Sequence, residues 1–380
     1  MMHVGLNAHL HSARAGYRSA GIHGYIDGLL RHLPAAAAGD PRDWAFSAFV
    51  GSANPLAIDG VAVRQSRLDT EPPPRRILWE QTLQPWLLGD FDLYHALAFV
   101  APLLLTTPSV VTVYDLSFMH YPRVLSPARR LYLRLFTALS CRRARRVIAI
   151  SHSTARDLTA TLNIPADKID VAAPGCDFGF FRPLPPETIA AFRRAHDLPE
   201  RYWLFVGTLE PRKNLPTLLA AYAALPPAER LPLIIGGGKG WDYEPIFAAV
   251  DDYDLGNTVQ FVGFISPELL PLWYNGAQSF VYPSVFEGFG LPVLEAMACG
   301  TPVIAAATSS LPEVVGAAGL TVPPHDTGAW TEALRRSHDA AWRDSARAQG
   351  LSAAQRYTWA ETARQTLLSY RRAVGMSDNR

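Results

Sequence analysis

Short apolar runs alternate with helical segments along almost the whole of this 380-residue chain. The runs with strand character are 4–8, 45–50, 61–63, 93–95, 110–113 and 147–150 in the first half, and 202–206, 233–235, 259–262 and 280–282 in the second. Alternation of this kind predicts parallel sheets covered by helices on both faces. We therefore expect an α/β fold made of two doubly wound, Rossmann-like domains.

The alternation is interrupted after Gly175, where three prolines follow within a short stretch. A chain of this length is long for one domain and comfortable for two. We expect an N-terminal domain over residues 1–180 and a C-terminal domain over residues 181–357. The last helix, at about 358–374, carries an apolar face, and we expect it to pack back on the N-terminal domain.

Composition excludes several classes of protein. The net charge is +1 and the basic residues are not interleaved with aromatic ones, so no nucleic acid partner is expected. The three cysteines lie far apart and fit neither a metal site nor a disulfide framework, which is typical of a reducing compartment. No window approaches ~20 uninterrupted apolar residues, and the first residues lack a signal-peptide pattern. We expect a cytoplasmic protein, at most peripheral on the inner face of a membrane.

Arginines concentrate in the predicted helix 127–141 and in the run RRARR at 142–146. A solvated helix face is the ordinary explanation of such a run. The alternative is a basic patch of the N-terminal domain that rests on anionic lipid headgroups.

The run FVYPSVFEGFGLPVLEAMACGTPVIA, residues 280–305, predicts a strand, a glycine-rich loop, a helix and a second strand. Pro292 suits the first helical position, where its missing N–H costs nothing. Unpaired backbone N–H groups at the helix start, behind a loop in which Gly288 and Gly290 let a ligand approach the main chain, predict an anion site.

Two glutamates flank this predicted anion site. Glu287 lies in the loop and Glu295 about one turn into the helix, so both could accept hydrogen bonds from sugar hydroxyls. The alternatives are a solvated loop charge for Glu287 and a carboxylate favoured by the helix dipole for Glu295. The glycines, the prolines and the next motif favour ligand binding.

A second motif, GTLEPRKN at 207–214, follows the predicted strand 202–206. Arg212 offers a fork of donors and Lys213 a compact charge, a combination that suits two phosphate groups. Two solvated surface cations are the alternative. The predicted topology places this loop and the Glu287 loop on the same edge of the second sheet.

The N-terminal half offers fewer candidates. Asp115 follows a buried strand, and open α/β sheets keep their chemistry at the carboxyl ends of strands. His95 and His120 are weaker candidates, because a lone histidine is more often structural. Gly16 and Gly21 lie between the first strand and the first helix without a complete GxGxxG pattern, so they are weak indications of phosphate binding.

The second half of the chain closely resembles retaining nucleotide-sugar glycosyltransferases of the GT-B fold, family four, also described as glycosyl transferases group 1. The matching segments are FVGTLEPRKNL, FVGFI, YPSVFEGFGLPVLEAMACGTPVI and SSLPEVVG. The first half matches more loosely through GIHGYIDGLL, VTVYDLSF, VIAISHSTARDL and PGCD. The resemblance covers nearly the whole chain.

The resemblance implies a donor site. Its residues would be Gly21, Thr208, Arg212, Lys213, Gly263, Phe264, Glu287, Gly288, Phe289, Gly290, Leu291 and Glu295. Arg212 and Lys213 match the diphosphate cations, Glu287 the contact to the sugar hydroxyls, and Glu295 the contact to the ribose. The backbone around Leu291 would meet phosphate, and Gly263 with Phe264 would meet the base.

Two positions depart from the family pattern. Thr208 stands where many relatives carry an arginine, so the diphosphate charge would fall to Arg212 and Lys213. Tyr114 precedes Asp115 where many relatives carry a histidine, which puts a histidine contact to the sugar or acceptor in doubt.

The implied reaction is transfer of a hexose, with retention at the anomeric carbon, from a nucleoside diphosphate sugar to a glycan or lipid-linked glycan. GDP-mannose is the expected donor, because GTLEPRKN resembles bacterial mannosyltransferase-like members. The expected catalytic residues are Glu287, Lys213, Arg212 and Asp115, with no metal and no cofactor beyond the substrate. The alternatives are a GT-B sugar-nucleotide 2-epimerase and a non-catalytic nucleotide-sugar-binding module.

Overall fold

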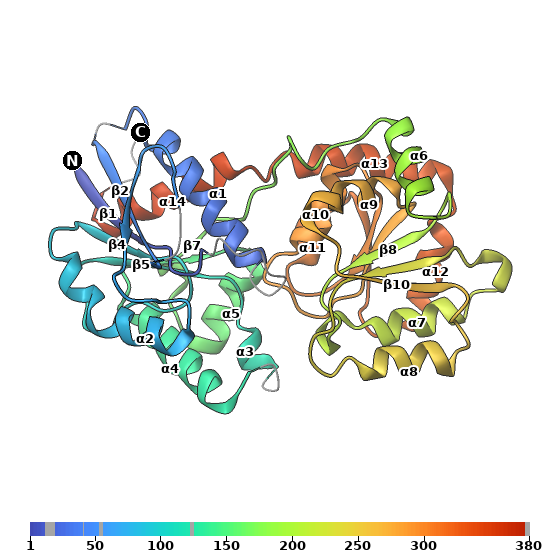
Figure 1. Ribbon diagram of the computed structural model, residues 1–380, viewed down its shortest axis with the longest axis horizontal. Helices are drawn as coiled ribbons and strands as arrows, with labels where there is room; N and C mark the ends of the chain where they lie inside the picture. Colours follow the sequence, from blue (N-terminus) through green and yellow to red (C-terminus); the bar gives the residue numbers. More distant parts are fainter. Residues whose placement is uncertain (12–19, 41, 53–55, 122–124, 377–380) are drawn as a thin grey trace. The chain divides into compact units, whose positions relative to one another are not determined.

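The computed structural model describes all residues except 12–19, 41, 53–55, 122–124 and 377–380. The chain forms two compact units, each with its own parallel sheet (Figure 1). Unit 1 comprises Met1–Gly175 and Tyr357–Arg380, and unit 2 comprises Cys176–Arg356. The chain therefore passes from unit 1 to unit 2 after Gly175, where the sequence pattern changes, and not after residue 180 as expected. It returns to unit 1 between Arg356 and Tyr357.

The sheet of unit 1 has the strand order β3-β2-β1-β4-β5-β6-β7, and all its neighbours pair in parallel. Its strands are β1 (Met2–Asn7), β2 (Trp44–Val50), β3 (Val61–Gln65), β4 (Leu93–Ala96), β5 (Ser109–Val113), β6 (Arg146–Ala149) and β7 (Ile169–Val171). The central strands β4 and β5 are buried along their whole length. Strands with both faces covered read as continuous apolar runs, which is why the sequence predicted them.

Helices cover both faces of this sheet, with α1 and α14 on one side and α4 and α5 on the other (Figure 1). The helices of unit 1 are α1 (Ala20–Ala37), α2 (Pro73–Thr82), α3 (Ser117–His120), α4 (Pro127–Arg143), α5 (His152–Leu162) and α14 (Trp359–Ala373). In the described part of the chain, no helix combines the length and the apolar character needed to cross a membrane.

Helix α14 lies against α1 and strands β5 to β7 of unit 1, although it comes from the far end of the chain. The hydroxyl of Tyr370 lies 2.7 Å from Nδ1 of the buried His95, and Thr362 Oγ1 donates to the carbonyl of Ala173 at 2.6 Å. A Cβ on Gly28 would lie 2.4 Å from the ring of Trp359, so a glycine is needed for this close approach. The C-terminal helix therefore completes the core of unit 1.

The sheet of unit 2 has the strand order β10-β9-β8-β11-β12-β13, again all parallel. Its strands are β8 (Trp203–Val206), β9 (Leu233–Gly236), β10 (Val259–Gly263), β11 (Ser279–Tyr282), β12 (Val303–Ala306) and β13 (Gly319–Val322). Strands β8 and β11 are neighbours at the centre, so the loops that follow them leave the same edge of the sheet. The expectation of two doubly wound parallel sheets is confirmed.

The helices of unit 2 also lie on both faces of its sheet (Figure 1). They are α6 (Pro186–Ala195), α7 (Leu215–Ala223), α8 (Glu244–Asp252), α9 (Leu270–Gly276), α10 (Leu291–Ala298), α11 (Leu311–Val315), α12 (Thr327–Arg336) and α13 (Ala340–Ala354). Helix α10 begins at Leu291, one residue before the expected start at Pro292, because Gly290 acts as its N-cap.

Candidate functional site

A buried ion pair joins the two loops that the sequence singled out in unit 2. Lys213, at the end of the 3-10 helix η4 (Pro211–Lys213) after β8, donates to Glu287 Oε1 at 2.5 Å. Its ammonium also lies 2.8 Å from the hydroxyl of Tyr282, the last residue of β11. The side chains of Lys213 and Glu287 are only 7% and 11% exposed. The alternatives of a solvated loop charge and solvated cations are therefore wrong.

Arg212 fastens the same two loops together. Its guanidinium donates to Glu210 Oε1 at 2.9 Å, to the carbonyl of Phe286 at 2.8 Å and to Glu287 Oε2 at 3.4 Å. Its own carbonyl accepts the amide of Val285 at 2.9 Å. Glu287 is thus held by both cations, one at each oxygen.

The charge states follow from these contacts. Burial opposes ionisation of Glu287, but Lys213 and Arg212 outweigh burial and lower the pKa of Glu287 to about 2. Burial lowers the pKa of Lys213, and nearby Arg212 lowers it further, while Glu287 acts in the opposite direction. The two cations are matched by the two carboxylates of Glu287 and Glu210, so the cluster has no formal net charge.

Sequence reasoning missed the hydroxyl groups that support Glu287. Ser284 Oγ donates to Glu287 Oε1 at 2.6 Å, and the hydroxyls of Ser309 and Ser310 donate to the Glu287 carbonyl at 2.6 and 3.0 Å. These serines lie inside the segments YPSVFEG and SSLPEVVG, which were recognised for their resemblance. Ser284 lies four residues before Gly288, which was the available signal, whereas no local pattern linked Ser309 and Ser310 to this loop.

The start of α10 lies directly after this cluster. Gly290 has φ 107°, which a side chain rarely tolerates, and a Cβ there would lie 2.8 Å from Leu311. Pro292 has no N–H, and the amides of Val293 and Leu294 donate to the carbonyl of Gly290 at 3.0 and 3.2 Å, so the amide of Leu291 is the donor that the start of α10 offers to a ligand. Phe289 is 4% exposed, and its carbonyl accepts the hydroxyl of Ser310 at 2.8 Å. Gly288 lies between these residues and Glu287.

Glu295 lies on α10, and among the described residues its hydrogen bond is to Tyr274 and not to the Lys213–Glu287 ion pair. Tyr274 of α9 donates to its Oε2 at 2.9 Å. Burial raises the pKa of Glu295 to about 7, and this hydrogen bond only partly opposes the shift. Glu295 is therefore poised to change its charge near neutral pH, unlike Glu287.

Three further expected donor residues follow β8 and β10 on the same edge. Thr208 is half-buried beside the loop after β9, and Gly263, with φ 71°, ends β10. Phe264 is 57% exposed, which leaves its ring available for stacking.

Sequence reasoning overlooked the glycine-rich stretch GGGKG at 236–240, which follows β9. Leu209 bridges to Lys239, and a Cβ on Gly237 would lie 1.9 Å from the carbonyl oxygen of Gly207. The loops after β8 and β9 are thus in close contact. The glycines after a predicted strand were a signal that was not used.

The site residues that the sequence suggested in unit 1 differ in whether their side chains are already used in structural contacts. Asp115 is half-buried and accepts the amide of Ser117 at 2.8 Å. Tyr114 is buried and donates to the carbonyl of Leu97 at 2.8 Å, so its hydroxyl is already used. Burial lowers the pKa of His95 to about 3, and its contacts to Thr112 and Tyr370 make it a structural residue.

The remaining candidates of unit 1 lie around its helices. His120 hydrogen-bonds to Asp157 at 2.9 Å. Gly21 lies in the first turn of α1, with open space where a Cβ would be. Gly16 falls outside the described residues.

An apolar cavity of about 1050 Å³ also lies in unit 1. Its walls include Leu10, which comes after β1, and Phe99, which comes after β4, so it opens at the carboxyl edge of the sheet. Phe99 has φ 55° and its ring packs on Tyr114, with the ring centroids 5.6 Å apart. Positive φ in a bulky residue is a strain that concentrates at functional sites.

A buried polar group lines this apolar cavity. Glu80 is 8% exposed, and Asn7 Nδ2 donates to its Oε1 at 3.0 Å. Burial raises the pKa of Glu80, although Arg76, 3.8 Å away, acts in the opposite direction. A large apolar space with a few polar groups is the usual form of a site for small organic ligands.

Comparison with known proteins gives matches in both units. A family model described as Glycosyltransferase Family 4 matches residues 21–180, and one described as Glycosyl transferases group 1 matches residues 188–348. O-antigen chain mannosyltransferase B of Escherichia coli is 34% identical over 293 residues, which is 76% of this chain and 77% of that protein.

Solved structures show the same two-sheet arrangement. Sucrose-phosphate synthase from Thermosynechococcus elongatus matches with a TM-score of 0.74 and 27% identity over 98% of both chains. The Anabaena protein HepE, solved with UDP and glucose, matches with a TM-score of 0.70 and 20% identity over 97% of this chain and 99% of that one.

Proposed function

Since this chain belongs to the family-four glycosyltransferases and has their GT-B fold, we propose that it transfers a hexose from a nucleoside diphosphate sugar to a glycan or lipid-linked glycan, with retention of anomeric configuration. Mannose is the proposed sugar and GDP-mannose the proposed donor. The O-antigen mannosyltransferase of E. coli supports mannose and a role in surface polysaccharide synthesis. HepE, a structural neighbour that binds UDP and glucose, supports a nucleotide-linked donor.

The observation that carries the proposal is the cluster of Lys213, Arg212 and Glu287 next to the start of α10. An ammonium has three donors, and Glu287 and Tyr282 occupy two of those of Lys213, so one is left for a ligand. The amide of Leu291, at the start of α10, supplies a further donor. A diphosphate there would meet a cation and a helix start at once.

In the proposed mechanism these groups stabilise the departing diphosphate. Charge develops on the phosphate oxygens as the sugar leaves, and fixed donors in a dry site stabilise that charge without reorganising. Glu287 orients the two cations, and we propose that it also meets the sugar hydroxyls. The acceptor attacks from the face that the diphosphate leaves, and the leaving phosphate oxygen takes its proton. Asp115 is proposed to orient the acceptor hydroxyl.

Glu295 and Phe264 are proposed to hold the nucleoside. A carboxylate accepts hydrogen bonds from both ribose hydroxyls when it is ionised, which Glu295 becomes above about pH 7. The exposed ring of Phe264 offers a face for the base.

The apolar cavity of unit 1 supports an acceptor that carries an apolar group. Its buried Glu80, together with Arg76, Gln81 and Arg129, offers polar contacts within a mainly apolar wall. This fits a glycan joined to a lipid better than a fully hydroxylated free sugar.

The test is incubation of the protein with a panel of nucleoside diphosphate sugars, with and without an acceptor, followed by proton NMR. The proposal predicts a released nucleoside diphosphate and a glycoside with the donor's anomeric configuration, both only when acceptor is present. A new sugar nucleotide formed without acceptor would identify the 2-epimerase instead. Donor binding without any release would identify a binding module.

A further inference from the structure

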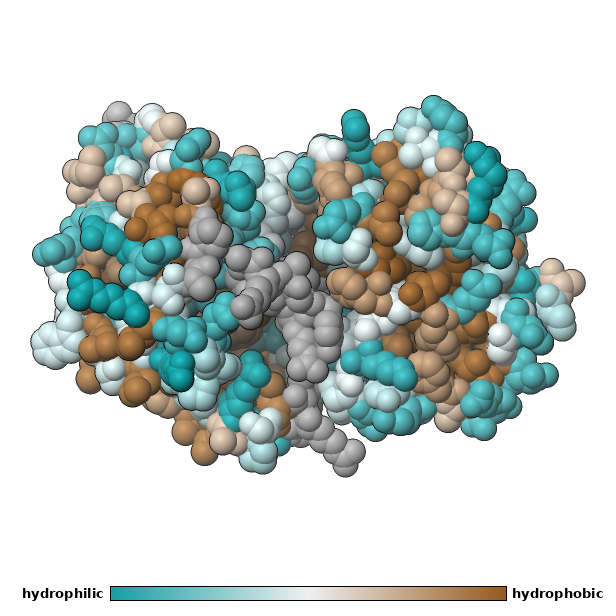
Figure 2. Space-filling view, in the orientation of Figure 1, coloured by the Kyte–Doolittle hydropathy of each residue, from teal (hydrophilic) through white to brown (hydrophobic). Residues whose placement is uncertain are grey.

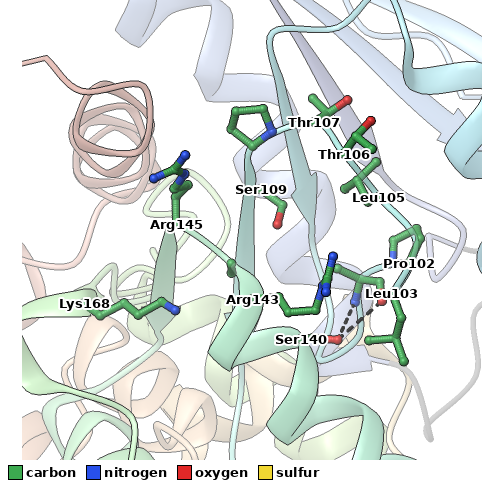
Figure 3. Close-up of a pocket in the computed structure, with 13 residues that line it drawn as sticks. Pro102, Leu103, Leu105, Thr106, Thr107, Ser109, Ser140, Arg143, Arg145 and Lys168 are labelled. Atoms are coloured by element: carbon green, nitrogen blue, oxygen red, sulfur yellow. Dashed lines mark hydrogen bonds between the residues drawn. The ribbon is translucent and has the colours of Figure 1, made fainter.

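A second pocket, of about 580 Å³, lies in unit 1 at the edge of the sheet opposite to Asp115 (Figure 3). Ser109, the first residue of β5, lines it, whereas Asp115 follows the last residue of that strand. Five residues of strand separate the two edges by roughly 16 Å at about 3.3 Å per residue. The pocket is therefore separate from the apolar cavity and from Asp115.

Three cations line this pocket, and its lining contains no carboxylate. Arg143 comes from the end of α4, Arg145 from the residue before β6, and Lys168 from the end of the 3-10 helix η3 (Ala166–Lys168). Figure 3 shows Arg143 on one side of the pocket and Lys168 on the other, with Ser109 between them in the view. In the described part of the chain, none of the three forms a salt bridge.

The positive charge of Arg143, Arg145 and Lys168 is not balanced by nearby carboxylates in the described part of the chain, unlike that of Arg146. Arg146 is paired with Asp170 at 2.5 Å. Among the described residues, the ammonium of Lys168 donates to the carbonyl of Arg142, at 2.6 Å, near the end of α4. Burial lowers the pKa of Lys168, Cys141 acts in the opposite direction, and the like charges of Arg145 and Arg146 lower it further. An anion in the pocket would relieve this repulsion.

Neutral donors surround the cations. The hydroxyls of Thr106 and Ser109 make no hydrogen bond to the described part of the chain. Ser140, 2% exposed, is already tied to the backbone of Ala101 and fixes the wall. Cations and hydroxyls without a carboxylate match the acceptor oxygens of a phosphate group.

We propose that this pocket binds the phosphate group of an organic phosphate or diphosphate ester, through Arg143, Arg145 and Lys168 with the hydroxyls of Thr106 and Ser109. The pocket is larger than a phosphate ion, and its prolines and leucines give the organic part an apolar wall. This site does not rest on the proposed transfer reaction.

The phosphate could belong to a soluble ligand or to a lipid headgroup. Leu131, Leu135 and Leu139 are 57%, 49% and 40% exposed and recur every fourth residue along α4, and Arg143 continues the series into the pocket. Figure 2 shows apolar surface in the region of α2 and α4. A lipid would use this surface, and a soluble ester would not.

The test uses the full chain and isothermal titration with pyrophosphate, which should also bind beside Lys213 in unit 2. We expect two sites in the wild type. Arg143→Gln combined with Arg145→Gln should weaken one of them about tenfold or more and leave the other unchanged, because charge-assisted hydrogen bonds are lost. Arg134→Gln, which removes an exposed arginine of the same helix outside the pocket, should change neither site.

A second arm measures retention on vesicles of phosphatidylcholine with and without phosphatidic acid. A soluble ligand predicts pyrophosphate binding without vesicle retention. A lipid headgroup predicts retention that needs phosphatidic acid, is lost in the double variant and is weakened by Leu135→Ser. The proposal is overturned if the double variant matches the wild type in both pyrophosphate affinity and vesicle retention. It is also overturned if Arg134→Gln loses as much affinity or retention as the double variant, or if the wild type binds neither probe at this pocket.

Discussion

At the residue scale, the site depends on a buried carboxylate that holds two cations. Glu287→Gln would leave Lys213 buried without its counter-charge, and breaking a buried pair costs about 3–5 kcal/mol. We expect urea unfolding at pH 7 to show a loss of that size. Glu332→Gln, which breaks an exposed pair with Arg335, should cost far less, because solvent screens that pair.

The pH dependence of that difference follows from the lowered pKa of Glu287. A depressed pKa stabilises the fold above the unfolded value of 4.5, and this stabilisation is lost as the pH falls towards about 2. The difference in unfolding free energy between the wild type and Glu287→Gln should therefore narrow as the pH falls below 4.5. A gap independent of pH throughout would contradict the ion pair.

Ionisation of Glu295 has the opposite effect on the unfolding free energy, because the pKa of Glu295 is raised to about 7. Its ionisation favours the unfolded chain, so Glu295→Gln should gain stability relative to the wild type as the pH rises from 4.5 to 7.

If the ionised form of Glu295 binds ribose, the donor's KM should fall as the pH rises from 6 to 8. The KM of Glu295→Gln should be higher and flat over that range, while a change confined to kcat would refute the ribose contact.

Much of the site could be predicted from sequence, but its internal contacts could not. The motifs identified Arg212, Lys213 and Glu287 as partners of one ligand. That Lys213 and Glu287 pair with each other depends on a contact between residues 74 positions apart, which local pattern does not encode. Ser284 and Glu210 were missed for the same reason, since their roles exist only once the two loops meet.

At the scale of elements, the start of α10 depends on the backbone of Gly290. Gly290→Ala would place a side chain at φ 107° and against Leu311, so we expect a loss of about 2 kcal/mol and weaker binding of nucleoside diphosphates. Gly24→Ala, within α1, is the matched control, because nothing lies within 4 Å of the position of its Cβ and alanine favours a helix. Equal stability of the two variants would contradict the role of the turn.

Element boundaries were predictable where both faces of a strand are buried. The runs that became β4, β5 and β11 are mainly apolar, with His95 and Thr112 as buried polar exceptions. Strands β7 and β13 were missed because the first has only three residues and the second contains a glycine and an exposed threonine. The position of α14 on unit 1 was foreseeable from its apolar face, whereas its hydrogen bond to His95 was not.

At the scale of the whole molecule, fixed protein cations are proposed to do what a metal does in other transferases. Treatment with EDTA should therefore leave the transfer rate unchanged, and added magnesium should not raise it. Loss of activity with EDTA that magnesium restores would show that the charge of Lys213 and Arg212 is insufficient.

The most direct test of the diphosphate site is binding of a nucleoside diphosphate against the monophosphate of the same base, by titration calorimetry. The wild type should prefer the diphosphate by about tenfold or more, since the second phosphate gains charge-assisted hydrogen bonds. Lys213→Ala should lose most of this preference while it still binds the monophosphate, which also shows that unit 2 is folded. An undiminished preference in Lys213→Ala would contradict the proposed site.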